Sequence, residues 1–163
     1  MSERKRSFFR QALPRASVLV LALVLALILA LALPLLLWQI PAAAATEYIV
    51  VVHPKNPLQR LSAEEARNIF LGRQRRWPDN SEITLVMNTG PEIHEAFTRG
   101  LLRKSPDQLA AYWKKILYSG GGPYPLATQG DEATKAYVGL HKNAIGYISG
   151  DALDRQVKKM RIH

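Results

Sequence analysis

From residue 46 onward, short β-branched runs alternate with amphipathic helical segments, and this alternation limits the possible folds most strongly. Glu47–His53 (EYIVVVH) is typical of a buried strand and is stopped by Pro54. The next segment, 62–71, has helical apolar periodicity and a predicted capping box between Ser62 and Glu65. The pattern predicts an α/β sandwich with a mostly parallel sheet. Further strands are predicted at 83–88, 144–149 and 157–162, and further helices at 91–102, 105–117 and 131–141.

Three connecting segments are predicted to be irregular because they are rich in proline, glycine or polar residues. They are 53–61, 72–82 and the sequence SGGGPYPLATQG at 119–130. In the predicted helix at 105–117, apolar residues recur at helical spacing and predict one buried face. That face comprises Leu109, Tyr112, Trp113, Ile116 and Leu117.

The first 45 residues have the composition of a targeting segment. Five basic residues and one acidic residue precede Val18–Leu37, which carries no charge, and Ala42–Ala45 offer an A-x-A cleavage site. The apolar run is also long enough, at about 20 residues, to span a bilayer. Residues 1–45 are therefore predicted to be a cleaved signal peptide or an uncleaved N-terminal anchor. Both alternatives place the rest of the chain in the periplasm or outside the cell, since the basic flank stays in the cytoplasm.

The remaining 118 residues suffice for one domain with a single core. The chain has a net charge of +9, of which residues 1–45 contribute +4, so the domain at 46–163 is about +5. Such a surface attracts anions, but an exported location argues against a nucleic-acid partner. The chain contains no cysteine, which excludes a thiol enzyme and a cysteine-based metal site.

No catalytic or metal-binding pattern is present in the sequence. His53, His94, His141 and His163 lack the spacing of zinc ligands, and no nucleophile elbow, zinc-protease helix or phosphate-binding loop occurs. The sequence therefore predicts a protein that is not an enzyme and uses no cofactor or metal.

Three segments, in the same order along the chain, resemble the phosphate ABC transporter substrate-binding proteins. They are LSAEEARNIFLGRQRRW at 61–77, SPDQLAAYW at 105–113 and AIGYI at 144–148. The resemblance implies one lobe of a type II periplasmic binding protein, a phosphate or other small-anion ligand, and a membrane transporter as partner. The family's first phosphate-gripping loop, rich in Thr, Gly and Ala, has no counterpart in this chain.

The turn after the strand at 83–88 is the first candidate ligand site, formed by Asn88, Thr89 and Gly90. Ligands of open α/β sheets lie beyond the carboxyl ends of strands, often at a helix N-terminus. The resemblance places the family's phosphate-binding Gly-Ser-Gly-Thr here, but in this chain Pro91 and Glu92 follow Gly90. Proline removes an N–H donor, and Thr89 with Glu92 predicts a capping box that would put a carboxylate at the helix N-terminus. The turn is therefore expected to bind phosphate weakly or to be only a self-capped helix start.

Two other segments are candidate ligand sites. Ser119, Gly120 and Gly121 expose backbone N–H groups that could hold an anion, and the alternative is a flexible connector. A basic patch of Arg73, Arg75 and Arg76 could grip a carboxylate or phosphate, and the alternative is a solvated turn with Trp77 packed beneath it.

Two functional classes follow from the sequence. The first is an exported, non-enzymatic domain that binds phosphate or another small anion. The second is an interaction or sensor module of the cell envelope that keeps the fold without binding phosphate. A homodimer that completes a binding cleft from two lobes is a further alternative.

Overall fold

The computed structural model describes residues 19–21, 23–27, 46–122 and 124–163. The chain divides into two units, 1–44 and 45–163. In the first unit, residues 19–21 and 23–27 are helical, and the rest of the predicted signal peptide or anchor lies outside the described residues. No helix within the described ranges is both long and apolar enough to cross a membrane.

The second unit is built on a six-stranded sheet in the order β2-β6-β1-β5-β3-β4. Strand β1 runs antiparallel to both of its neighbours, whereas the pairs β2·β6, β3·β5 and β3·β4 are parallel. The predicted mostly parallel α/β sheet is therefore confirmed. The strands are β1 (Tyr48–Val52), β2 (Arg60–Leu61), β3 (Thr84–Asn88), β4 (Leu126–Thr128), β5 (Ala144–Ser149) and β6 (Lys158–Ile162).

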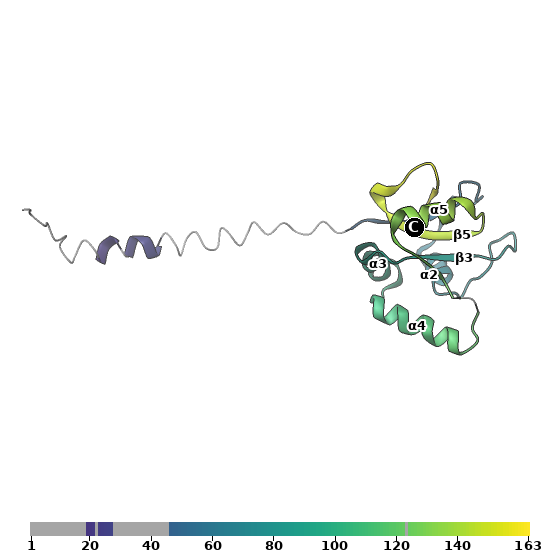
Figure 1. The fold of residues 1–163 in the computed structure, drawn as a ribbon, viewed down its shortest axis with the longest axis horizontal. Coiled ribbons are helices and arrows are strands. Elements are labelled where there is room, and N and C mark those ends of the chain that lie inside the picture. Colours follow the sequence, from purple (N-terminus) through teal and green to yellow (C-terminus); the bar gives the residue numbers. More distant parts are fainter. Residues whose placement is uncertain (1–18, 22, 28–45, 123) are drawn as a thin grey trace, which may run out of the picture. The chain divides into compact units, whose positions relative to one another are not determined.

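Helices cover both faces of the sheet, with α5 on one face and α2, α3 and α4 on the other (Figure 1). Helices α2 and α4 begin with the predicted capping boxes, Ser62 with Glu65 and Ser105 with Gln108. The helices are α2 (Ala63–Phe70), α3 (Pro91–Phe97), which continues as a π-helix η1 (Thr98–Leu102), α4 (Pro106–Tyr118), α5 (Gly130–Leu140) and a 3-10 turn η2 (Gly150–Ala152).

Each face of the sheet has its own apolar cluster. The larger lies under α2, α3, η1 and α4 and centres on the rings of Phe70, Phe97 and Tyr147. The smaller lies under α5 and includes Val51 and Val138. Both clusters and all six strands belong to residues 46–163, so the described core lies within this unit.

Three details of the sequence-based fold are wrong. The sequence predicts irregular structure at 53–61 and 119–130, yet these segments contain β2 and β4. These strands have two and three residues, too few to show periodicity, and they form because β6 and β3 offer free edges. The helical spacing predicts that Leu117 is buried, but its side chain is 53% exposed, because the last turn of α4 extends past the core.

Candidate functional site

The carboxyl ends of β3, β4 and β5 meet at one edge of the sheet, where α3 and α5 begin. A shallow hollow of about 300 Å³ lies there, which we call the edge hollow. This is the position at which open α/β sheets place their ligands. Its walls are formed by Thr46, Gly90, Pro91, Glu92, Ile93, Gly130, Asp131 and Ser149.

Asn88 links the elements that surround the edge hollow. Its side chain is buried, and its Oδ1 accepts the Gly90 N–H at 2.9 Å. Its Nδ2 donates to Asp131 Oδ1 at 2.6 Å, and the same carboxylate oxygen accepts the Ser149 N–H at 3.3 Å. Asn88 therefore fixes the turn after β3 to the first turn of α5, and the side chain holds the hollow's shape rather than facing a ligand.

The predicted capping box between Thr89 and Glu92 is wrong. The Thr89 hydroxyl instead donates to the Thr128 carbonyl at 2.9 Å, because β4 lies beside this turn. The N-cap of α3 is Gly90, which makes no side-chain capping bond, and the N-cap of α5, Gln129, makes none either. The two helices that begin at the edge hollow thus lack side-chain caps, whereas α2 and α4 have complete capping boxes.

Two electrostatic effects with opposite sign act on an anion in the edge hollow. The positive ends of two helix dipoles favour an anion there. The charged side chains among the lining residues are Glu92 and Asp131, and both are acidic. A fully ionised oxyanion is repelled by these carboxylates, whereas an oxyanion that carries a proton can donate a hydrogen bond to one of them.

His94 and Tyr147 form hydrogen bonds that hold the turn after β3 in place. The Tyr147 hydroxyl, on β5, donates to the Asn88 carbonyl at 2.8 Å, and His94 Nδ1 lies 2.6 Å from the same hydroxyl oxygen. Because the single hydroxyl proton goes to Asn88, His94 Nδ1 is the donor in the second bond. Burial raises the pKa of Tyr147 and lowers the pKa of His94, since it disfavours the charged form of each group.

The lowered pKa of His94 predicts a loss of stability in mild acid. Below the ordinary histidine pKa of about 6.5, the unfolded chain binds a proton at this position and the folded domain does not. The melting temperature should therefore fall as the pH drops from 7 toward the folded-state pKa. Melting curves of the wild type and His94→Gln across this range test the prediction, and the variant should show the shallower decline. Equal slopes would contradict it. His53, whose pKa is lowered by burial and by Lys55 and Lys142, contributes in the same direction in both proteins.

The second sequence candidate is the C-terminus of α4. The N–H groups of Ser119, Gly120 and Gly121 donate to the carbonyls of Lys115, Leu117 and Ile116, at 3.1, 3.3 and 2.9 Å. These bonds complete the last turn of the helix. The three N–H groups are therefore engaged within the chain and are not free to cradle an anion.

The three arginines of the basic patch do not converge on one point. Arg75 Nε donates to the Gly72 carbonyl at 3.0 Å, and Arg76 donates to the Asn80 carbonyl at 2.8 Å and lies 3.6 Å from Glu82. Arg73 is exposed. Trp77 is buried beneath the turn, and its Nε1 donates to the Asn143 carbonyl at 3.1 Å. The arrangement is that of a solvated turn over a buried tryptophan.

The structure brings parts of these two candidates together. Arg75 lies against Gly122, where an added Cβ would collide with an arginine amino nitrogen. Arg75 and Gly121 line one hollow at the amino ends of β3 and β4, away from the carboxyl ends that carry the edge hollow. The sequence does not predict this proximity, because the two segments are far apart along the chain.

The sequence also does not predict the contact between Asn88 and Asp131. Its one local sign is that Asp131 is an acidic residue in the first turn of α5.

Across the described ranges, no group of three or more histidine or acidic side chains is placed to hold a metal ion.

Solved structures share this fold. An ABC-type phosphate transport receptor from Vibrio cholerae matches with a TM-score of 0.50 and 19% identity over 72% of this chain and 46% of its own. A phosphate ABC transporter substrate-binding protein with bound phosphate from Clostridium perfringens matches with a TM-score of 0.56 and 18% identity, over 72% of this chain and 45% of its own. PstS from Borrelia burgdorferi matches with a TM-score of 0.54 and 12% identity, over 74% of this chain and 49% of its own.

At 12–19% identity, the likeness to these structures shows that this chain has the same fold. This chain shares it with binding proteins of phosphate transport, and it spans less than half the length of the three that are compared. No protein-family model and no curated protein sequence matches the chain.

Proposed function

We propose that residues 46–163 form an exported, non-enzymatic binding domain that holds a small oxyanion such as phosphate in the edge hollow. The observation that carries this proposal is that α3 and α5 both begin at the hollow without side-chain caps. Pro91, the first residue of α3, has no N–H group, so α3 offers the N–H groups of Glu92 and Ile93, and α5 offers those of Gly130 and Asp131. With the hydroxyls of Ser149 and Thr46, which also line the hollow, they are the donors an oxyanion requires. The solved structures of the same fold are those of phosphate-binding proteins, which supports the choice of ligand class.

The acidic lining sets the expected strength and selectivity of binding. Glu92 is exposed and Asp131 faces the same hollow, so phosphate binds with millimolar affinity. Hydrogen phosphate can donate a hydrogen bond from its P–OH group to a carboxylate, whereas sulfate carries no proton at neutral pH and can only accept. The domain should therefore prefer phosphate to sulfate.

Removing the exposed carboxylate tests the site. Isothermal titration should give a dissociation constant for phosphate about fivefold smaller for Glu92→Gln than for the wild type, since one repulsive charge contributes about 1 kcal/mol at this range. Glu64→Gln is the matched control, because Glu64 is also a first-turn acid but belongs to α2. Micromolar binding by the wild type would contradict the role given to the carboxylates. The absence of saturable binding in both wild type and Glu92→Gln would reject the site.

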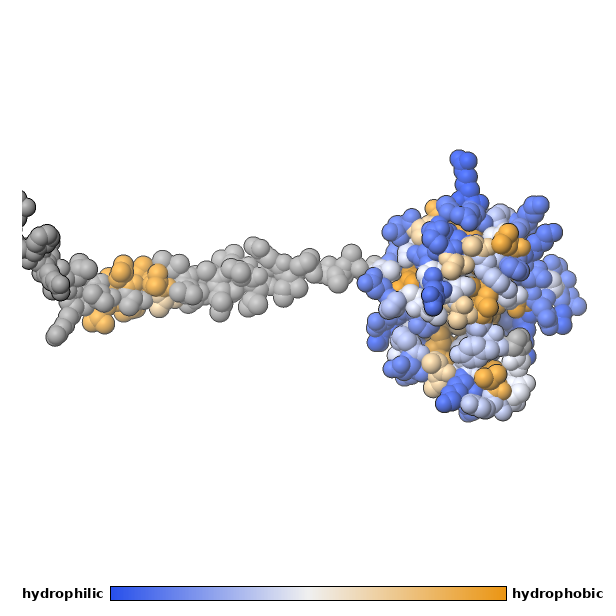
Figure 2. Space-filling model, viewed as in Figure 1, coloured by the Kyte–Doolittle hydropathy of each residue, from blue (hydrophilic) through white to orange (hydrophobic). Residues whose placement is uncertain are grey.

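An interaction module of the cell envelope is the second candidate function. It is favoured by Leu117 and Tyr118, which are 53% and 79% exposed at the end of α4. Figure 2 shows apolar surface over the C-terminal half of this helix, within a mostly hydrophilic surface. An oxyanion that raises the melting temperature supports the first function, because only a ligand of the folded state does so. The oxyanion-binding function also includes a membrane transporter as the partner of the domain.

A further inference from the structure

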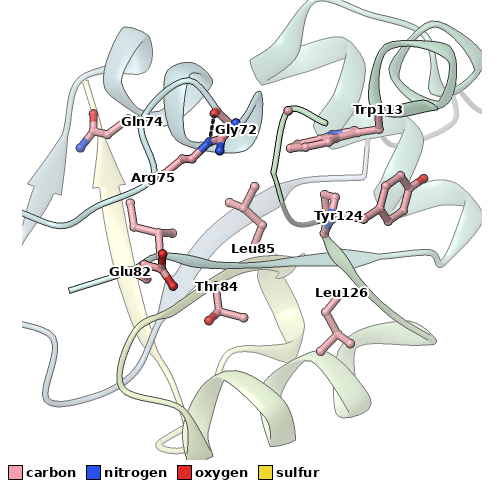
Figure 3. A pocket seen from close by; sticks show the side chains of 12 residues that line it. Gly72, Gln74, Arg75, Glu82, Thr84, Leu85, Trp113, Tyr124 and Leu126 are labelled. Atoms are coloured by element: carbon pink, nitrogen blue, oxygen red, sulfur yellow. Dashed lines mark hydrogen bonds between the residues drawn. The ribbon is translucent and has the colours of Figure 1, made fainter. Parts of the chain in front are cut away.

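A second hollow lies at the amino ends of β3 and β4, and we call it the β3–β4 hollow. Its volume is about 260 Å³. Figure 3 shows Leu85 pointing from β3 toward Trp113 and Arg75, with Tyr124 beside the indole ring. Thr84 and Leu126 point to the other side of the strands (Figure 3). One side of the hollow is therefore apolar and aromatic, and its rim carries the Arg75 guanidinium, the Gln74 amide and the Glu82 carboxylate. The negative charge of Glu82 is offset by Arg76, 3.6 Å away.

The indole of Trp113 forms a fixed wall of this hollow. It is 4% exposed, and its benzene edge fits against Gly72, where an added Cβ would lie 2.7 Å from Cη2. The Tyr124 ring lies at an angle of 69° to it, with centroids 6.0 Å apart. Trp113 Nε1 is the one buried side-chain polar atom without a hydrogen-bond partner in the part of the chain that the structure describes. Native proteins rarely leave such a donor unsatisfied.

Arg75 supplies a charge with spare donors. Its Nε is bound to the Gly72 carbonyl, which holds the guanidinium in place at the rim. Within the described ranges, its two amino groups make neither a hydrogen bond nor an ion pair, whereas the neighbouring Arg76 is engaged with Asn80 and Glu82. A planar guanidinium with free amino groups matches the two oxygens of a carboxylate.

We propose that the β3–β4 hollow is a binding site for a small aromatic carboxylate. The aromatic ring packs on Leu85 against the surface that Trp113 and Tyr124 form together, and the carboxylate pairs with Arg75. The size agrees, since an apolar cavity of about 150 Å³ holds benzene and the present hollow is larger by roughly a short carboxylate arm. The site shares no lining residue with the edge hollow, so this inference is independent of the proposed oxyanion function.

Indole N–H signals in a ¹⁵N–¹H spectrum of residues 46–163 test the proposal with phenylacetate as the probe. The domain contains two tryptophans, and Trp77, whose Nε1 is bound to Asn143, is the internal reference. The Trp113 signal should move saturably with phenylacetate while the Trp77 signal stays. Phenylacetamide, which has the same shape without the charge, should bind about tenfold more weakly because it loses a charge-assisted bond.

Variants separate the guanidinium from general charge effects. Arg75→Gln should weaken phenylacetate binding about tenfold, and Arg73→Gln, in the same turn but outside the hollow, should leave it unchanged. Gly122→Ala displaces the Arg75 side chain without altering its charge and should have a similar effect to Arg75→Gln. Tyr124→Ala should weaken binding, whereas Tyr118→Ala should not.

Three results would overturn the proposal. They are an unmoved Trp113 signal at saturating phenylacetate, equal affinity for phenylacetate and phenylacetamide, and wild-type affinity in Arg75→Gln. Inorganic phosphate that moves the Trp113 signal as phenylacetate does would also overturn it, because the ring would then have no part in binding.

Discussion

Replacing Phe97 by alanine should lower the free energy of unfolding of residues 46–163 by about 3–5 kcal/mol. Phe97 is fully buried, and its ring stacks on Tyr147 with a centroid distance of 3.7 Å. It also makes edge contacts with Phe70 and Tyr48, at 4.7 and 5.5 Å. The substitution removes one aromatic ring from the contact of α3 with the sheet and leaves a cavity that rigid neighbouring rings cannot fill.

Urea unfolding followed by circular dichroism measures the effect. A domain of this size has a stability of about 5–15 kcal/mol, so the variant is expected to lose a large part of it. Tyr118→Ala is the control, since this exposed residue should change stability by less than about 0.5 kcal/mol. A loss below about 1.5 kcal/mol for Phe97→Ala would mean that the aromatic cluster is not tightly packed.

Replacing Gly72 by alanine should destabilise the domain by about 2–4 kcal/mol. Two physical costs add at this position. The backbone has φ +66°, a left-handed conformation that disfavours residues with a Cβ. The new methyl group would also lie 2.7 Å from Trp113 Cη2, so the indole or the turn after α2 must move.

Gly120 provides a matched control for this prediction. It has nearly the same backbone conformation, with φ +69°, but an added Cβ there would have no atom within 4 Å. Gly120→Ala should therefore cost only about 1–2 kcal/mol, the backbone part alone. The difference between the two unfolding free energies measures the contact with Trp113. Equal values for the two variants would show that this contact is loose.

The Gly72 result also bears on the β3–β4 hollow, because the same glycine holds both of its main groups. Gly72 lets the indole of Trp113 approach the turn, and its carbonyl binds Arg75 Nε. Gly72→Ala should thus weaken phenylacetate binding as well as stability, whereas Gly120→Ala should affect stability alone. The comparison tests whether the turn after α2 organises the site.

Most secondary structure of the domain was predictable because its signals are local. A capping box needs residues three positions apart, and Ser62 with Glu65 shows it in both sequence and structure. β1 and β5 were likewise evident as apolar runs, since β1 is buried between β5 and β6. The site residues were harder to interpret, because the same glycine-rich sequence at 119–122 suits an anion cradle and a helix C-terminus. Only the carbonyls of α4 decide between them.

The amino-acid sequence by itself determined the alternation of strands and helices, the two capped helices and the α/β class, since these depend on neighbours within about one helical turn. Tertiary structure alone decided the short strands β2 and β4, which exist only because another strand edge lies beside them. It also decided the bond from Asn88 to Asp131 and the burial of Lys135, whose ammonium lies 2.8 Å from Asp154. Those contacts join side chains distant in sequence, or depend on how α5 is covered, and no local pattern encodes them.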